Sequence, residues 1–191
     1  SDPIDKEEIC NKYKIAVKGK KIIICGTSFY KNNPTSLRVL DNLTKKKIDV
    51  KIIWLNHKGD ISKIPNYSNN IIQLPILNKN ELPSIYKICD LLLFPSLYEG
   101  MGMPPLEAMR CGIPVVCSNT SSLPEIVGDA ALTCNPNDDI EMTKKILKLF
   151  ENKEFYKKKV DEGFRRAKLF DYEKTHQKII NIYEEELAKK A

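Results

Sequence analysis

Short apolar runs alternate with helix-like segments along most of this chain, and that alternation limits what it can fold into. Several runs are apolar at consecutive positions, as in 91–94, which is typical of strands buried on both faces of a parallel sheet. Helices between such strands cover the two faces. The sequence predicts an α/β fold with a Rossmann-like parallel sheet of about six strands, at 21–25, 50–55, 70–74, 91–94, 114–118 and 131–134.

Helical patterns fill the connections and the end of the chain. We expect helices at 34–46, 81–89, 104–111 and 122–127, and a helical C-terminal tail at 138–150, 153–168 and 172–187. Asn137 or Asp138 can cap the first tail helix. We expect the apolar stripes of the tail to face the core, at Ile140, Ile146, Leu147 and Phe150 in its first helix and at Ile179, Ile180, Tyr183 and Leu187 in its third.

The expected domain organisation is simple. Residues 1–18 form a linker or a short N-terminal helix, and residues 19–191 form one domain that includes the tail helices at 138–190. A chain of 191 residues that is 42% apolar can bury a proper core, so disorder is excluded. No apolar run approaches the roughly 20 residues of a membrane-spanning helix, and the charged N-terminus does not resemble a signal peptide.

The cysteines and histidines predict a reducing compartment and no metal site. The six cysteines contain no C-x-x-C pair and several lie in apolar runs, which favours reduced core thiols in a cytoplasmic protein. His57 and His176 are isolated, without metal-ligand spacing around them. We therefore expect no metal and no bound cofactor.

The net charge of +6 comes from dispersed lysines. They alternate with acidic residues on expected helix surfaces, which favours a solvated face. Attraction to anionic substrates or to the cytoplasmic face of a membrane is the second interpretation. No aromatic platform is interleaved with the basic residues, so we expect no nucleic-acid partner.

The segment 98–109 holds the chemistry. It follows an expected strand and places Gly100 and Gly102 before a helix that begins near Pro104 and Pro105. Glycines let backbone N–H groups approach a ligand, and a helix N-terminus favours an anion such as a diphosphate. Carboxylates on either side can accept hydrogen bonds from sugar hydroxyls, and we expect the second to lie in the first turn of the helix. Phosphate and sugar together indicate a nucleotide-sugar.

These residues also carry a resemblance to a known family. The segments 94–109 (FPSLYEGMGMPPLEAM), 111–116 (CGIPVV) and 121–131 (SSLPEIVGDAA) are similar to the signature of retaining GT-B glycosyltransferases. The chain most resembles the large "family four" group of glycosyl group 1 transferases. The similarity extends from about Lys21 to the C-terminus. It implies the donor-binding, C-terminal half of a GT-B fold.

The resemblance implies roles for particular residues. In the family, the first glutamate contacts the donor sugar and the second holds the ribose, which points to Glu99 and Glu107. A lysine after the first strand's glycine neutralises the diphosphate, which points to Lys31, although an ordinary exposed loop lysine is the alternative. We therefore expect catalytic roles for Glu99 and Lys31. The further donor-binding residues are Gly100, Met101, Gly102 and Met103 around the sugar and diphosphate, with Ile76 and Leu77 against the nucleobase.

The sequence departs from the family at one point. An arginine usually stands near this lysine, and Thr27 and Tyr30 occupy the corresponding places here, so part of the phosphate clamp is absent or comes from elsewhere. No D-x-D motif is present, which argues against metal-bridged diphosphate binding. Asp138 and Asp139 are interpreted as helix-capping residues, and Glu125 and Asp129 as structural ones.

Two functions stay open from the sequence. The first is the C-terminal domain of a retaining glycosyltransferase, whose saccharide or lipid-linked acceptor binds through an N-terminal domain that the sequence lacks. Such a protein could associate peripherally with a membrane. The alternative is a non-catalytic nucleotide-sugar binding subunit that works with a partner chain. A nucleotide-sugar epimerase is disfavoured because the G-x-G-x-x-G fingerprint is absent.

Overall fold

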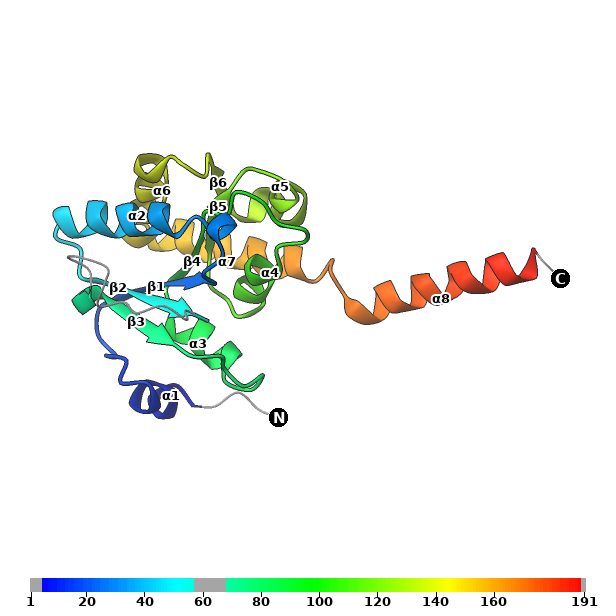
Figure 1. The fold of residues 1–191 in the computed structure, drawn as a ribbon, viewed down its shortest axis with the longest axis horizontal. Coiled ribbons are helices and arrows are strands. Elements are labelled where there is room, and N and C mark those ends of the chain that lie inside the picture. Colours follow the sequence, from blue (N-terminus) through cyan, green and yellow to red (C-terminus); the bar gives the residue numbers. More distant parts are fainter. Residues whose placement is uncertain (1–4, 57–67, 190–191) are drawn as a thin grey trace.

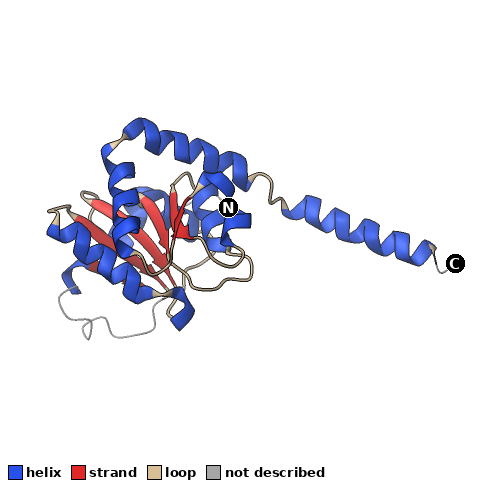
Figure 2. Ribbon diagram, turned by 90° about the horizontal axis from the view of Figure 1, so that it is seen from above, coloured by secondary structure: helices blue, strands red, loops and turns tan. Residues whose placement is uncertain are grey.

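The structure is a computed structural model that describes residues 5–56 and 68–189. Within these residues, six parallel strands form one sheet in the order β3-β2-β1-β4-β5-β6. Figures 1 and 2 show this sheet from two directions, with helices on both of its faces. The prediction of a Rossmann-like parallel sheet flanked by helices is confirmed.

The strands follow the apolar runs closely. They are β1 (Lys20–Cys25), β2 (Val50–Leu55), β3 (Ile71–Leu74), β4 (Leu91–Phe94), β5 (Val115–Ser118) and β6 (Leu132–Cys134). Every residue of β4 and β5 is buried, because helices cover both faces of the sheet at its centre. Continuous apolar sequence is therefore required in these two strands.

Eight helices are found among the described residues. They are α1 (Lys6–Lys12), α2 (Asn33–Lys45), α3 (Leu82–Ile88), α4 (Met103–Arg110), α5 (Leu123–Val127), α6 (Asp139–Glu151), α7 (Lys153–Ala167) and α8 (Tyr172–Ala188). Asp138 caps α6 by accepting a hydrogen bond from the backbone N–H of Glu141, as its sequence position predicts.

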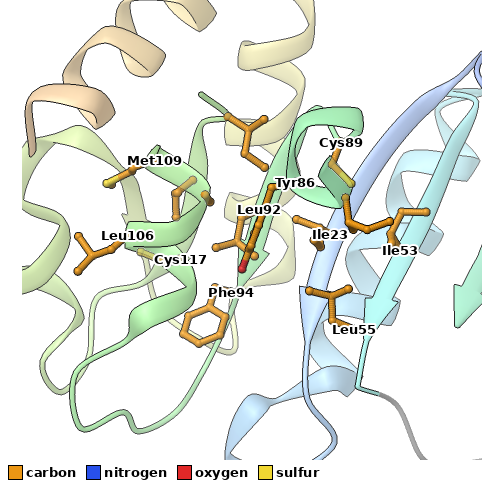
Figure 3. Packing of buried hydrophobic residues seen from close by; sticks show 14 of the residues in the cluster. Ile23, Ile53, Leu55, Tyr86, Cys89, Leu92, Phe94, Leu106, Met109 and Cys117 are labelled. Carbon is orange, nitrogen blue, oxygen red and sulfur yellow. The ribbon is translucent and has the colours of Figure 1, made fainter. Parts of the chain in front are cut away.

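The core consists of two apolar clusters, one on each face of the sheet. On one face, residues of α1, α3, α4 and α5 pack against β1, β2, β4 and β5, and Figure 3 shows part of this cluster around Tyr86, Leu92 and Leu106. On the other face, α2 and α6 cover the sheet with side chains such as Leu40 and Ile146. The helices named here thus bury one apolar side each against the sheet.

The predicted core-facing stripe of α6 is wrong only at Ile140, since Ile146 is buried and Leu147 and Phe150 pack against the core, whereas the prediction for the stripe of α8 is wrong. Ile140 is 54% exposed, because the buried positions of α6 are Met142, Thr143, Ile146 and Leu149. The stripe of α8 does not face the core either, since Tyr183 is 68% exposed and Leu187 is 69% exposed. Figure 1 gives the reason, because α8 projects away from the sheet and its helices. Periodicity shows that a helix has an apolar face but not what covers that face.

The first helix is joined to the domain through a buried carboxylate. Glu81 accepts hydrogen bonds from Lys12 Nζ at 2.5 Å, from the hydroxyl of Tyr13 at 2.9 Å and from the backbone N–H of Asn78 at 3.0 Å. The hydrogen bond from Lys12 and that from Asn78 lower the pKa of Glu81 to about 2. Ile9 is fully buried beside this network. The segment expected as a linker or short helix therefore packs as part of the core.

Some expectations concern the chain as a whole. In residues 5–56 and 68–189, no helix is long and apolar enough to cross a membrane. All six cysteines are free thiols. His57 lies outside the described residues, and His176 lies on α8.

The contrast between α6 and α8 can be tested with one substitution in each. Ile146→Ala should lower the free energy of unfolding by about 2–5 kcal/mol, because it opens a cavity in the core. Ile179→Ala, on the exposed stripe of α8, should change it by less than about 0.5 kcal/mol. Urea denaturation of both variants measures the two values. A comparable loss at Ile179 would show that α8 packs against the domain.

The Glu81 network predicts an acid dependence of stability. The pKa of Glu81 is depressed in the folded state relative to roughly 4.3 in an unfolded chain, so its contribution is present above about pH 5 and is lost as the pH falls toward 2. Glu81→Gln should lower the free energy of unfolding by roughly 1–3 kcal/mol at pH 7 and by much less at pH 2, where the folded carboxyl group is about half protonated. Urea denaturation at both pH values, with Glu151→Gln on the exposed end of α6 as the control, measures this difference. An equal loss at both pH values would contradict it.

Candidate functional site

The order of the strands places the switch point of the sheet between β1 and β4. Chain connections leave these two central strands toward opposite edges of the sheet, since β2 lies beside β1 and β5 lies beside β4. In such sheets, ligands bind outside the carboxyl ends of the strands at this switch point. The loops that follow β1 and β4 carry Lys31 and Glu99, respectively.

The β1 loop is shaped around Gly26. Gly26 has a φ of +78°, and its carbonyl oxygen accepts hydrogen bonds from Trp54 Nε1 at 2.8 Å and from Asn33 Nδ2 at 3.0 Å. A short 3₁₀ turn, Phe29–Lys31, then leads into α2. A side chain at Gly26 would lie 3.3 Å from Cγ and Cε of Lys31, so the glycine leaves room for the lysine stem. The loop therefore directs Lys31 back toward the end of β4.

Lys31 and Glu99 form an ion pair at the switch point of the sheet. Lys31 Nζ lies 2.6 Å from Glu99 Oε1, although the two residues are far apart in the sequence. The ammonium also lies 4.7 Å from the ring centroid of Phe94, the last residue of β4. Both side chains are largely shielded, with 15% of Lys31 and 11% of Glu99 exposed. The alternative of Lys31 as an ordinary exposed loop lysine is therefore wrong.

A group of hydroxyl side chains holds the β4 loop in place. Ser96 is fully buried and donates a hydrogen bond to Glu99 Oε1 at 2.6 Å. The hydroxyl of Ser118 donates to the carbonyl oxygen of Ser96. Ser121 Oγ accepts from the backbone N–H of Glu99, and Ser122 Oγ donates to its carbonyl oxygen, both at 3.0 Å. The carboxylate therefore sits on a loop that is fixed from both sides.

The two glycines of the loop, Gly100 and Gly102, differ in the space around them. Gly102 has a φ of +71° and precedes α4, where a Cβ atom would lie 2.7 Å from Cδ2 of Leu123. Gly100 has open space around it. Met101 and Met103 are about half exposed beside them. Gly102 is thus required for the turn into α4, whereas Gly100 leaves one side of the loop accessible to a ligand.

Glu107 lies one turn further along α4 than the sequence indicates. The helix begins at Met103, so Pro104 and Pro105 occupy its first turn and Glu107 its second, and no acidic residue is in the first turn. Its Oε2 atom accepts a hydrogen bond of 2.9 Å from the hydroxyl of Tyr86 on α3. The prediction of a first-turn position is wrong, because the αL residue Gly102 starts the helix earlier than the prolines indicate.

Cys25 lies close to the tyrosine that holds Glu107, since its Sγ is 4.0 Å from the hydroxyl of Tyr86. Burial raises the pKa of Cys25 to about 12, with smaller increases from Glu107 and Glu99 and a decrease from Lys31. Cys25 is the last residue of β1. Burial also raises the pKa of Tyr86 well above its usual value, so its hydroxyl keeps its proton and donates to Glu107. Tyr86 thus connects Glu107 to the end of β1, and Lys31 pairs with Glu99 at the loops that follow β1 and β4.

The other predicted residues lie at this edge or nearby. Ile76 follows β3 and is 75% exposed, whereas Leu77 is partly buried against the core. Asp139, interpreted as a capping residue, forms an ion pair with Arg38 at 2.8 Å. Among the described residues, no group of three histidine, cysteine or acidic side chains could hold a metal ion.

Sequence reasoning missed the residues that hold the two glutamates. Tyr86 lies within an expected helix and carries no motif signal, and its contact with Glu107 depends on how α3 packs against α4. Ser96 stands three residues before Glu99 inside the motif, so its position was a usable signal. Ser121 and Ser122 come from a segment that reaches the loop only through the pairing of β5 with β4.

The two loop glycines provide a matched pair of substitutions. Gly102→Ala should lower the free energy of unfolding by about 1–2 kcal/mol, because alanine is strained at this φ and its methyl group contacts Leu123. Gly100→Ala should change it by less than about 0.5 kcal/mol, since nothing lies within 4 Å of the added atom. Thermal unfolding of the two variants measures the difference. Equal stability would show that the αL turn is not required.

Comparisons with known proteins identify the family and the fold of this chain. A family model described as glycosyl transferases group 1 matches residues 5–166. The chain is 43% identical over 103 residues to O-antigen chain mannosyltransferase B of Escherichia coli, covering 54% of this chain and 27% of that protein. It is 33% identical over 147 residues to an uncharacterised glycosyltransferase, MJ1178, of Methanocaldococcus jannaschii, covering 73% of this chain and 42% of that protein. The chain thus spans less than half the length of these relatives.

Solved structures show the same fold. Sucrose-phosphate synthase from Thermosynechococcus elongatus superposes with a TM-score of 0.83 at 16% identity, over 98% of this chain and 50% of that one. The Anabaena protein HepE, solved in complex with UDP-glucose, has a TM-score of 0.82 at 19% identity, over 97% of this chain and 54% of that one. With the family model covering most of its length, this chain belongs to the glycosyl transferases group 1, a family with the GT-B fold.

Proposed function

We propose that this chain is the C-terminal, donor-binding domain of a retaining glycosyltransferase. The parent protein would transfer a sugar from a nucleoside diphosphate sugar to a saccharide or lipid-linked acceptor. The observation that carries the proposal is the meeting of Lys31 and Glu99 at the switch point of the sheet. A cation for phosphate and a carboxylate for sugar hydroxyls stand side by side there, next to the loop that starts α4.

Each part of the donor has a chemical counterpart in the site. The start of α4 and the ammonium of Lys31 would attract the diphosphate. Glu107, held by Tyr86, would accept hydrogen bonds from the two ribose hydroxyls, and Glu99 would accept them from the sugar. Ile76 and Leu77 would lie against the nucleobase. No part of this assignment requires a metal ion.

The same groups would support the reaction itself. When the bond to the sugar breaks, negative charge develops on the leaving nucleoside diphosphate. Lys31 and the backbone amides around Gly100–Met103 would stabilise that charge, and the partial shielding of Lys31 supports this role. Departure of the leaving group on the face that the acceptor attacks would retain the anomeric configuration. Product anomers formed by the longer parent protein, assigned by NMR, test this point.

The acceptor would be bound elsewhere. Sucrose-phosphate synthase and HepE share this fold, and each is about twice as long as its segment that matches this chain. We propose that an N-terminal domain supplies the acceptor site, at the cytoplasmic face of a membrane if the acceptor is lipid-linked. This chain alone would then bind donor nucleotides but transfer sugar slowly or not at all.

Isothermal titration calorimetry tests donor binding directly. The ligands are UDP, GDP and ADP, each with and without an attached sugar. GDP-mannose and UDP-glucose are included because some relatives are named mannosyltransferases and one neighbour was solved with UDP-glucose. At least one nucleotide is expected to bind. No measurable heat with any of them would contradict the proposal.

Glu107 provides the sharpest substitution for the ribose assignment. Glu107→Ala should weaken binding of the preferred nucleotide by roughly 1–3 kcal/mol, because charged hydrogen bonds to the ribose are lost. The loss should be similar with and without the attached sugar. Glu151→Ala, which removes an exposed glutamate at the far end of α6, is the control and should bind like the unmodified chain. Unchanged nucleotide affinity in Glu107→Ala would exclude the ribose contact.

A further inference from the structure

The ion pair between Lys31 and Glu99 competes with two proposed donor contacts, that of Lys31 with the diphosphate and that of Glu99 with the sugar. Lys31 Nζ is 2.6 Å from Glu99 Oε1, and both side chains are largely shielded from water. Yet the diphosphate needs the ammonium, and the sugar needs the carboxylate. One ammonium cannot neutralise Glu99 and a diphosphate equally, because its charge and its three hydrogen-bond donors are shared between them. Donor binding must therefore rearrange this pair.

Glu99 is built to remain in place when Lys31 moves. Ser96 donates to the same atom, Oε1, at 2.6 Å, and Ser96 itself is fully buried. The backbone of Glu99 is held by Ser121 and Ser122. Its second oxygen, Oε2, has no hydrogen-bond partner within residues 5–56 and 68–189. The carboxylate thus has one anchored oxygen and one that is available to a ligand.

Lys31 is held by weaker and less directional contacts. Besides Glu99, its ammonium contacts the faces of Phe94 at 4.7 Å and Tyr30 at 5.3 Å. Its stem packs beside Gly26, where no side chain obstructs it. A flexible four-carbon stem over aromatic rings allows the ammonium to swing without any change in the backbone. Of the two partners, Lys31 is the one that can move.

On the basis of the proposed function, we infer that Lys31 exchanges partners when the donor binds. Its ammonium leaves Glu99 for the diphosphate, and Glu99, still held by Ser96, accepts hydrogen bonds from the donor sugar. Ser96 is then a positioning residue for Glu99. A nucleoside diphosphate without sugar breaks the pair and leaves the carboxylate unneutralised, whereas a nucleotide-sugar supplies hydroxyl donors in its place. The exchange favours the intact donor over the spent nucleotide.

The exchange predicts that removing the charge of Glu99 strengthens the binding of the spent nucleotide. Glu99→Gln should bind the nucleoside diphosphate, and also inorganic pyrophosphate, about three- to tenfold more tightly, because the ion pair no longer has to be broken. The gain in affinity from the attached sugar should shrink by a similar factor. Calorimetry with the three ligands measures both effects. Glu151→Gln makes the same change in net charge far from the site and should show neither effect.

A double substitution and a serine substitution complete the test. In a Lys31→Met background, Glu99→Gln should give a clearly smaller gain in affinity, because only the repulsion between the carboxylate and the phosphates is removed and there is no pair to break. Ser96→Ala should reduce the gain from the sugar but not the binding of the nucleoside diphosphate, and Ser96→Thr should restore that gain. If Glu99→Gln is not folded by circular dichroism, Glu99→Asp replaces it and should show the same direction with a smaller change.

The outcomes separate this inference from the proposed function. Unchanged or weaker binding of the nucleoside diphosphate by Glu99→Gln, or a gain that is equally large without Lys31, would overturn the exchange. If the exchange is overturned in this way but Glu107→Ala still loses nucleotide affinity, the proposed donor site remains supported. If the unmodified chain binds no nucleotide, the proposed function fails and the exchange fails with it.

Discussion

Burial of β1 and β4 on both faces is the constraint on which the rest of this structure depends. Because helices must cover both faces of these strands, the connection after β1 runs over one face through α2 and the connection after β4 runs over the other through α4. The loops at the carboxyl ends of β1 and β4 therefore lie side by side at the point where the strand order reverses. The hydrophobic effect places Lys31 next to Glu99, although neither residue belongs to the core.

Polar contacts then refine what this packing brings together. Gly26 leaves room for the lysine stem, Ser96 anchors one oxygen of Glu99, and Tyr86 anchors Glu107 from a neighbouring helix. These supports are buried or largely buried, where hydrogen bonds hold side chains in one orientation. The proposed donor contacts are in this way preorganised, and the partner exchange of Lys31 is the one rearrangement that donor binding would require.

Much of this could be predicted from the sequence, and the failures have definite causes. Apolar runs such as 91–94 predict the strands correctly, because a strand buried on both faces is apolar at consecutive positions. The stripe of α8 was misassigned because a 3.6-residue period shows only that a face is apolar, and Leu187 is exposed in this chain. The sequence predicts Glu107 in the first turn of α4, but it lies in the second, because prolines suit the first turn of a helix without marking its first residue.

Local pattern and spacing encode the fold class, the strands, the glycine-containing loop at 98–109 and the family resemblance, so these follow from the amino-acid sequence alone. Which side chains contact each other follows only from the tertiary fold. The pairing of Lys31 with Glu99, the support of Glu107 by Tyr86 and the buried contact of Ser96 with the carboxylate join residues from separate loops and helices. Such contacts depend on strand order and helix packing, which no local pattern of residues specifies.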